Sequence, residues 1–125
     1  MITSAGYNPT RDAKNGTITN LGEKTGGQSV ALGYKASASG DQSLAIGGDT
    51  RAEGAASIAI GGDDLDKIAN NNVINTAFAE VSGSRLVAGA YKSTTASGQG
   101  AVALGVQSTA EGNLATSFGT ASTKQ

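Results

Sequence analysis

The chain has 125 residues and a formal net charge of −1, and Gly, Ala, Ser and Thr fill 66 of its positions. His and Cys are absent, which excludes imidazole general bases, thiol nucleophiles, thiolate metal sites and disulfides. Nine basic and ten acidic side chains leave no footprint for nucleic acid. No apolar run reaches the roughly 20 residues of a membrane helix, so we expect no direct membrane insertion.

The N-terminal segment carries little structural information. Residues 1–11 show no usable pattern, and residues 12–25 are interpreted as a degraded copy of the unit that follows. Met1 is not followed by the apolar core of a signal peptide, so we expect the sequence to be a fragment.

From Gly26 the chain repeats itself every 14 residues. The repeat units are residues 26–39, 40–53 and 54–67 and, after a 30-residue interval, 98–111 and 112–125. Each unit holds two short stretches that alternate with period 2, separated by glycine-rich corners. Two short strands and two corners make one coil of a solenoid, so the repeat predicts an all-β chain folded as a parallel β-roll with 14-residue coils.

The first stretch of each unit has bulky apolar residues on one face and only Ser, Ala or Gly on the other. The bulky residues, which we expect to form the core and the packing surface between chains, are Val30, Leu32, Leu44, Ile46, Ile58, Ile60, Val102, Leu104 and Phe118. Strands without a charged face are usually buried on both sides. A thin coil encloses one row of bulky residues against the small ones and has no second surface to offer. The sequence therefore predicts an obligate homo-oligomer.

The repeat resembles the head repeat of the trimeric autotransporter adhesins of Gram-negative bacteria, the YadA-like head. The residues that carry the resemblance are 29–40, 43–54 and 101–112. The resemblance implies a left-handed β-roll assembled as a homotrimer. It also implies a non-enzymatic surface adhesin, exposed outside the outer membrane, that attaches to host extracellular-matrix proteins or cell-surface glycoprotein receptors. The stalk and membrane anchor of such adhesins are expected to lie outside this fragment.

Residues 68–97 interrupt the repeats at 26–67 and 98–125 within a single head domain over 1–125. Asp64 and Asp66 fall on inward positions, where unpaired carboxylates are costly, so we expect the chain to leave the roll there. Residues 73–81 are predicted to form an extra strand, residues 84–89 to rejoin the repeat, and residues 91–95 to form an enlarged corner.

This interval is interpreted either as a receptor-binding protrusion or as an insertion that extends the sheet and grips a neighbouring chain. The candidate ligand contacts are Asn70, Asn71, Asn72, Phe78, Arg85 and Tyr91. Asp63, Asp64 and Asp66 suit either a calcium ion or a solvated acidic turn.

No catalytic, cofactor-binding or metal-binding residues are predicted, and the expected function is adhesion without catalysis. The alternative is a structural spacer or fibre segment, of autotransporter or phage type, that projects a separate binding tip. An acyltransferase built on a hexapeptide-repeat solenoid is disfavoured, because that class has a six-residue period and typically uses a His base.

Overall fold

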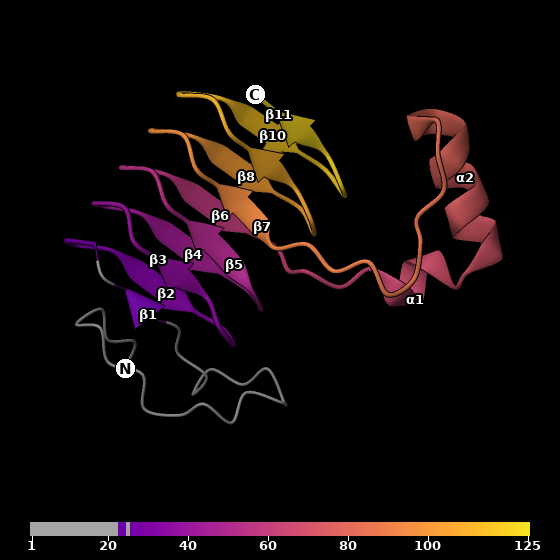
Figure 1. The fold of residues 1–125 in the computed structure, drawn as a ribbon, viewed down its shortest axis with the longest axis horizontal. Coiled ribbons are helices and arrows are strands. Elements are labelled where there is room, and N and C mark those ends of the chain that lie inside the picture. The colour runs from indigo at the N-terminus through magenta and orange to yellow at the C-terminus, as the bar shows by residue number, and fades with distance from the viewer. Residues whose placement is uncertain (1–22, 25) are drawn as a thin grey trace.

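The computed structural model describes residues 23–24 and 26–125. These residues form eleven short strands in two parallel sheets and two helices (Figure 1). The first sheet contains β2 (Val30–Leu32), β4 (Leu44–Ile46), β6 (Ile58–Ile60), β8 (Val102–Leu104) and β10 (Thr116–Phe118). The second sheet contains β1 (Glu23–Lys24), β3 (Ser37–Ala38), β5 (Thr50–Ala52), β7 (Thr94–Ala96), β9 (Thr109–Ala110) and β11 (Thr123–Lys124).

Successive strands alternate between the two sheets, so each coil contributes one strand to each. In the first sheet Val30 pairs with Leu44 and Leu44 with Ile58, which confirms the predicted 14-residue coil with two strands. The predicted degraded copy at 12–25 lies outside the described residues except for Glu23 and Lys24. These two residues form β1 and pair in parallel with β3, 14 residues onward.

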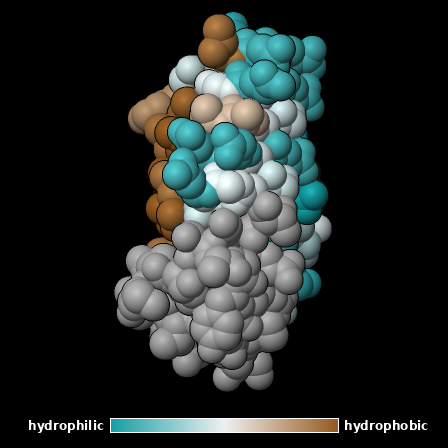
Figure 2. All heavy atoms as spheres, turned by 90° about the vertical axis from the view of Figure 1, so that its left-hand side faces the viewer, coloured by the Kyte–Doolittle hydropathy of each residue, from teal (hydrophilic) through white to brown (hydrophobic). Residues whose placement is uncertain are grey.

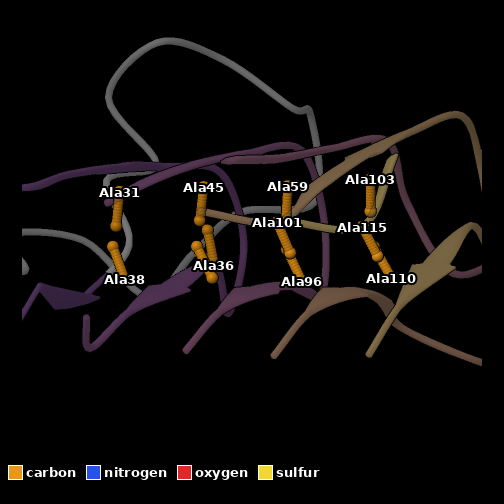
Figure 3. Close-up of a cluster of buried hydrophobic side chains, with 11 residues drawn as sticks. Ala31, Ala36, Ala38, Ala45, Ala59, Ala96, Ala101, Ala103, Ala110 and Ala115 are labelled. Carbon is orange, nitrogen blue, oxygen red and sulfur yellow. The ribbon is translucent and has the colours of Figure 1, made fainter. Parts of the chain in front are cut away.

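The space between the sheets is filled by small side chains. The buried apolar residues of the roll are alanines, namely Ala31, Ala36, Ala38, Ala45, Ala52, Ala59, Ala96, Ala101, Ala103, Ala110 and Ala115. Figure 3 shows their methyl groups pointing toward one another from the two sheets. Hydroxyls complete the interior: Ser29 and Ser43 each donate to a corner carbonyl, those of Gly26 and Gly40, at 2.8 and 2.7 Å.

The bulky apolar residues lie on the outside, which corrects the expectation that the coil encloses them. We call this surface, formed by Val30, Leu32, Leu44, Ile46, Ile58, Ile60, Val102, Leu104 and Phe118, the bulky face. Its aliphatic residues are partly exposed, and Phe118, predicted in a core slot, is 78% exposed. The interior between the sheets holds Ala, Ser and Thr side chains, and the alternation along each strand turns the larger aliphatic side chains outward. Figure 2 shows hydrophobic residues gathered along one side of the roll and hydrophilic residues along the other.

The coils are packed closely at their glycine corners. A Cβ atom built on Gly40 would lie 2.0 Å from the carbonyl oxygen of Gly54, its counterpart one coil later. Real Cβ atoms do not approach backbone so closely, so this corner requires glycine.

Left-handed backbone recurs at corners seven residues apart. The non-glycine residues in this conformation are Gln28, Lys35, Gln42, Asp49, Ala56, Gln107, Leu114 and Ala121, with φ between 52° and 65°. Two such corners per coil turn the chain from one sheet to the other.

A helical excursion, which we call the arm, occupies residues 64–93 between β6 and β7. It contains α1 (Asp66–Ala69) and α2 (Asn72–Ser82), and Figure 1 shows both helices standing away from the roll. The strand predicted at 73–81 is therefore wrong, because these residues lie within α2. The chain rejoins the roll at Thr94 rather than near Ser84, and Thr94 and Thr95 belong to β7 instead of to an enlarged corner.

The arm does not disturb the stacking of coils. Ile58 pairs with Val102 in the first sheet, and Thr50 pairs with Thr94 in the second, across the insertion. Joining Asp63 directly to Thr94 would recreate the sequence Gly48-Asp49-Thr50 of the preceding corner. The arm is thus a 30-residue insertion in one corner of a regular roll. Within the part of the chain that the structure describes, no helix is long and apolar enough to cross a membrane.

Candidate functional site

Two surfaces of the molecule are candidates for function: the bulky face and the arm. The bulky face follows directly from the period-2 alternation of the repeat. The arm departs from that repeat, and its side chains form a separate hydrogen-bonded structure.

Thr94 anchors the returning chain at the base of the arm. Its hydroxyl accepts hydrogen bonds from the backbone amides of Gly62 and Gln107, both at 3.0 Å. The same oxygen lies 2.7 Å from the carbonyl of Gly62 and 2.9 Å from that of Gly105, as a donor to either. Thr94 is fully buried, and its hydrogen bonds to three residues, Gly62, Gly105 and Gln107, join the insertion point to the next coil.

Gln107 closes the base from the following coil. Its side-chain amide donates to the carbonyls of Asp63 and Ala90, both at 2.8 Å. The backbone amide of Lys92 also donates to the Asp63 carbonyl, at 3.2 Å. The outgoing and returning chains are therefore clamped together where they meet the roll.

Helix α2 has a well-defined cap at each end. The side chain of Asn71 accepts from the amide of Ile74 at 3.1 Å, and Gly83 ends the helix in the left-handed region with φ 97°. These are common helix-terminating arrangements. The run of three asparagines and the glycine at 83 mark the helix boundaries in the sequence.

Asn75 holds α2 against the rest of the arm. Its side-chain amide donates to the carbonyls of Ala69 and Leu86, and its side-chain oxygen accepts from the amide of Leu86, at distances of 2.8–2.9 Å. Asn75 is 1% exposed, and a buried polar side chain that satisfies all of these partners fixes the orientation of the helix. Leu65 is the other buried side chain within residues 64–93.

A surface pair, the partly exposed Asp66 and the exposed Tyr91, connects α1 to the returning chain. The Asp66 carboxylate accepts from the backbone amide of Gly89 at 2.7 Å and from the Tyr91 hydroxyl at 2.8 Å. The Gly89 amide, and then the Tyr91 hydroxyl, hold the pKa of Asp66 below its usual value. The hydrogen bond to Asp66 raises the pKa of Tyr91 in turn.

Acidic residues meet where the chain leaves the roll, but they do not form a metal centre. Burial, and then the neighbouring Asp49 carboxylate, raise the pKa of Asp63. Across residues 23–24 and 26–125, no group of three His, Cys, Asp or Glu side chains is placed to hold a metal ion.

The outer side of α2 is apolar and uncovered. Val73 and Val81 are 79% and 90% exposed. With Ala77 they stand four residues apart and so share one line along the helix, while Ile74 lies beside that line, half exposed. In the described part of the chain, α1 is the helix or strand that α2 contacts, and no strand reaches it.

The structure brings the predicted ligand contacts together on the arm but already uses most of them internally. Asn71 caps α2, and Arg85 donates to Thr76 and Asn72 at 2.9 and 3.0 Å. Asn70 is exposed and Phe78 half-buried.

Sequence reasoning missed the residues that hold the arm in place. Gln107, Thr94 and Asn75 were not predicted as structural anchors. Thr94 was detectable, because it aligns with Thr50 once the 30-residue insertion is removed. The partners of Asn75 and Gln107 depend on tertiary contacts that the repeat pattern does not encode.

Comparison with known proteins gives one match. The model of the YadA head domain repeat family matches residues 25–50, 38–63 and 96–123, which together make up more than half of the chain. The arm lies between the second and third matched stretches. No curated protein and no solved structure matches the chain. The resemblance derived from the repeats is confirmed.

Proposed function

We propose, from the premise that this chain belongs to the YadA head family of trimeric autotransporter adhesins, that it forms a homotrimeric head that attaches to a host ligand. Heads of this family are non-enzymatic, surface-exposed passenger domains that trimerise and bind host molecules. For this chain, the proposed ligand class is an extracellular-matrix protein or a cell-surface glycoprotein receptor. The proposed roll is left-handed.

The bulky face is the observation that supports the proposed trimer. No other element of the described chain covers it, and its residues run in register through five coils. A continuous apolar surface of this kind marks an interaction site in a soluble protein. Three copies related by a threefold axis would bury the bulky faces against one another, as symmetry favours for identical chains.

The mass of the assembly tests the trimer. Light scattering is expected to give a mass near three times 12.2 kDa that persists when the protein is diluted to submicromolar concentration. A folded species of a single chain mass would contradict the proposal, since the bulky face would then be stable in water.

Adhesion is tested with a panel of matrix proteins and glycoprotein receptors presented to the assembled head. Three identical sites on one rigid unit gain effective concentration over a single site, so the panel uses immobilised multivalent ligands. Binding to any member supports adhesion, whereas a trimer that binds none contradicts it.

A spacer that carries another binding tip is the second candidate. It is favoured by the internal hydrogen bonds of Asn71, Asn72, Arg85 and Tyr91, which leave these side chains committed within the arm. Deleting residues 64–93 restores the regular corner and separates the two roles of the arm. Ligand binding is lost if the arm is the adhesive element, and is unchanged if the arm has no ligand.

A further inference from the structure

The arm has a surface that its own chain does not cover. Helix α2 is 11 residues long, and an isolated helix of this length is marginal in water. It has contacts to α1 and a hydrogen-bonded link to Leu86, but none to a strand of the described roll. Its apolar line of Val73, Ala77 and Val81 faces away from these contacts, so the helix has a second face suited to packing.

The side chains of that face indicate a partner whose surface is also apolar. Glu80 is the one charged side chain within α2. Asn72, Thr76 and Arg85 form a separate polar facet, joined by hydrogen bonds. Glu80 borders this face, three residues after Ala77, and the valine, isoleucine and alanine side chains beside it suit a dry protein interface better than a charged or polar ligand.

The position of the arm identifies which partner is within reach. The chain leaves β6 at Ile60, a residue of the bulky face, and passes through Gly61, Gly62 and Asp63 into the arm. The chain returns at Thr94, the first residue of β7 in the second sheet, so the arm stands on the edge of the roll where the bulky face and the second sheet meet. A helix that starts at this edge and projects away from its own roll (Figure 1) has a neighbouring protomer of the proposed trimer as the nearest large apolar surface outside its own chain.

We infer that the apolar line of α2 packs on a neighbouring protomer of the same trimer, so that the arm is an intersubunit clasp. This inference rests on the proposed trimer and adds a second contact to it. The polar facet around Asn72 and Arg85 stays in solvent. The occupant of the apolar face is a second copy of this chain and not an external ligand.

Single cysteines test the clasp, because the chain contains no native cysteine. Val81→Cys places a thiol on the apolar line. Glu80→Cys places one at the polar edge of the same helix, about 100° around the helix axis from Val81. In the purified trimer, the Val81→Cys thiol is expected to react with N-ethylmaleimide at least about tenfold more slowly than the Glu80→Cys thiol, because access requires local opening. A trimer in which both thiols react at the same rate would overturn the clasp.

A photo-crosslink identifies the occupant. The two cysteine variants are labelled with benzophenone maleimide in denaturant, refolded and irradiated as purified protein. The Val81→Cys variant is expected to give a product of two chain masses, and the Glu80→Cys control much less of it. Slow maleimide reaction without a two-chain product would overturn the inference, since the cover would then come from the same chain.

The two proposals fail separately. If light scattering gives a trimer but the Val81→Cys thiol reacts as fast as the control, the trimer stands and the clasp falls. If the protein is a monomer, both fall. The variant lacking residues 64–93 adds a second readout: it is expected to remain a trimer but to dissociate at a lower temperature than the full chain. Equal dissociation temperatures would contradict a stabilising clasp.

Discussion

The side-chain amide of Gln107 donates to the backbone carbonyl of Asp63 at 2.8 Å, across 44 residues of sequence. The same amide holds the carbonyl of Ala90, so one residue of the next coil joins both ends of the arm. These polar contacts and Thr94 join the roll to the arm, and within the described residues neither helix of the arm contacts a strand of the roll. The arm can therefore loosen while the roll remains folded.

Replacing Gln107 with Ala tests this separation. The variant leaves the Ala90 carbonyl without its side-chain donor, which we expect to cost the closed arm about 1–2 kcal/mol. Hydrogen exchange should show faster exchange at the amides of Leu86 and Gly89, with unchanged protection in β4 and β6. Gln99→Ala is the control, because Gln99 is exposed at the opposite corner. Faster exchange throughout the roll would contradict an independent arm.

The glycine corners predict a large effect from a single methyl group. In Gly40→Ala the new Cβ would meet the Gly54 carbonyl at 2.0 Å, so adjacent coils must separate. We expect the free energy of unfolding to fall by about 2–3 kcal/mol, measured by urea denaturation. Gly48→Ala is the matched control, since its Cβ would lie 3.9 Å from its nearest neighbour. Equal effects from both substitutions would show that coil spacing does not limit this corner.

Leu114 offers a stabilising substitution. It has φ 62° and is 81% exposed, so a bulky residue occupies left-handed backbone without burial. Asn tolerates this conformation better than Leu, and we expect Leu114→Asn to raise the free energy of unfolding by about 0.5–1 kcal/mol. Leu114→Ala shortens the side chain without easing the backbone and should not stabilise. A gain from Ala equal to that from Asn would assign the effect to lost apolar exposure.

The Asp66–Tyr91 pair predicts how the arm responds to pH. The folded pKa of Asp66 lies below its ordinary 3.8. Its contribution to the stability of the arm is therefore complete above pH 3.8 and is lost as the pH falls through the folded pKa. The pKa of Tyr91 is raised above its ordinary 10.0. Its contribution to the stability of the arm is therefore complete below pH 10 and is lost as the pH rises through the folded pKa. Exchange of the Gly89 amide should accelerate at both extremes, beyond its intrinsic pH dependence.

Tyr91→Phe distinguishes the acid transition of the arm from the alkaline one. This variant removes the alkaline transition and keeps the Gly89 amide hydrogen bond, so a smaller acid transition should persist. Asp66→Asn should abolish the acid transition and weaken the alkaline one, because a neutral amide oxygen still accepts from the Tyr91 hydroxyl. An alkaline transition that survives in Tyr91→Phe would have to arise from another group.

The bulky face predicts an asymmetric response to charge. Ile46→Asp places a carboxylate on the surface proposed to meet two other chains, and burial of an unpaired charge costs several kcal/mol. Light scattering should show dissociation of the trimer. Ser37→Asp introduces the same charge on the second sheet, where Ser37 pairs beside Arg51, and should leave the mass unchanged. Dissociation of the Ser37→Asp variant instead would place the interface on the second sheet.

The periodicity of the sequence was sufficient to predict the 14-residue coil, but not which side chains point into its interior. The spacing of Val30, Leu44 and Ile58 predicted the parallel register, because equivalent residues recur every 14 positions. Both faces of these strands lack charge, so alternation alone could not show which face points inward. The folded roll decides it: alanine, serine and threonine fill the interior, and the isoleucines lie on the outside.

The arm shows a different limit of sequence reasoning. Val73, Ile74 and Val81 are β-branched residues with a high strand propensity, which favoured the strand interpretation of 73–81. The i, i+4, i+8 spacing of Val73, Ala77 and Val81, with Asn71 before it and Gly83 after it, indicated a helix. Here the capping residues and the spacing outweighed propensity. The hydrogen bonds of Asn75 and Gln107 depend on the folded arm, and no local pattern predicts them.

The corner between Asp63 and Thr94 behaves as a natural acceptor site for foreign sequence. The coils on either side stay in register across 30 inserted residues, and Thr94 and Gln107 hold the two ends together. Any compact segment whose ends meet could occupy this position at little cost, because chain closure depends only weakly on length. The inserted segment could therefore be replaced in evolution, or by a displayed peptide in an engineered variant, without changes to the sequence of the roll.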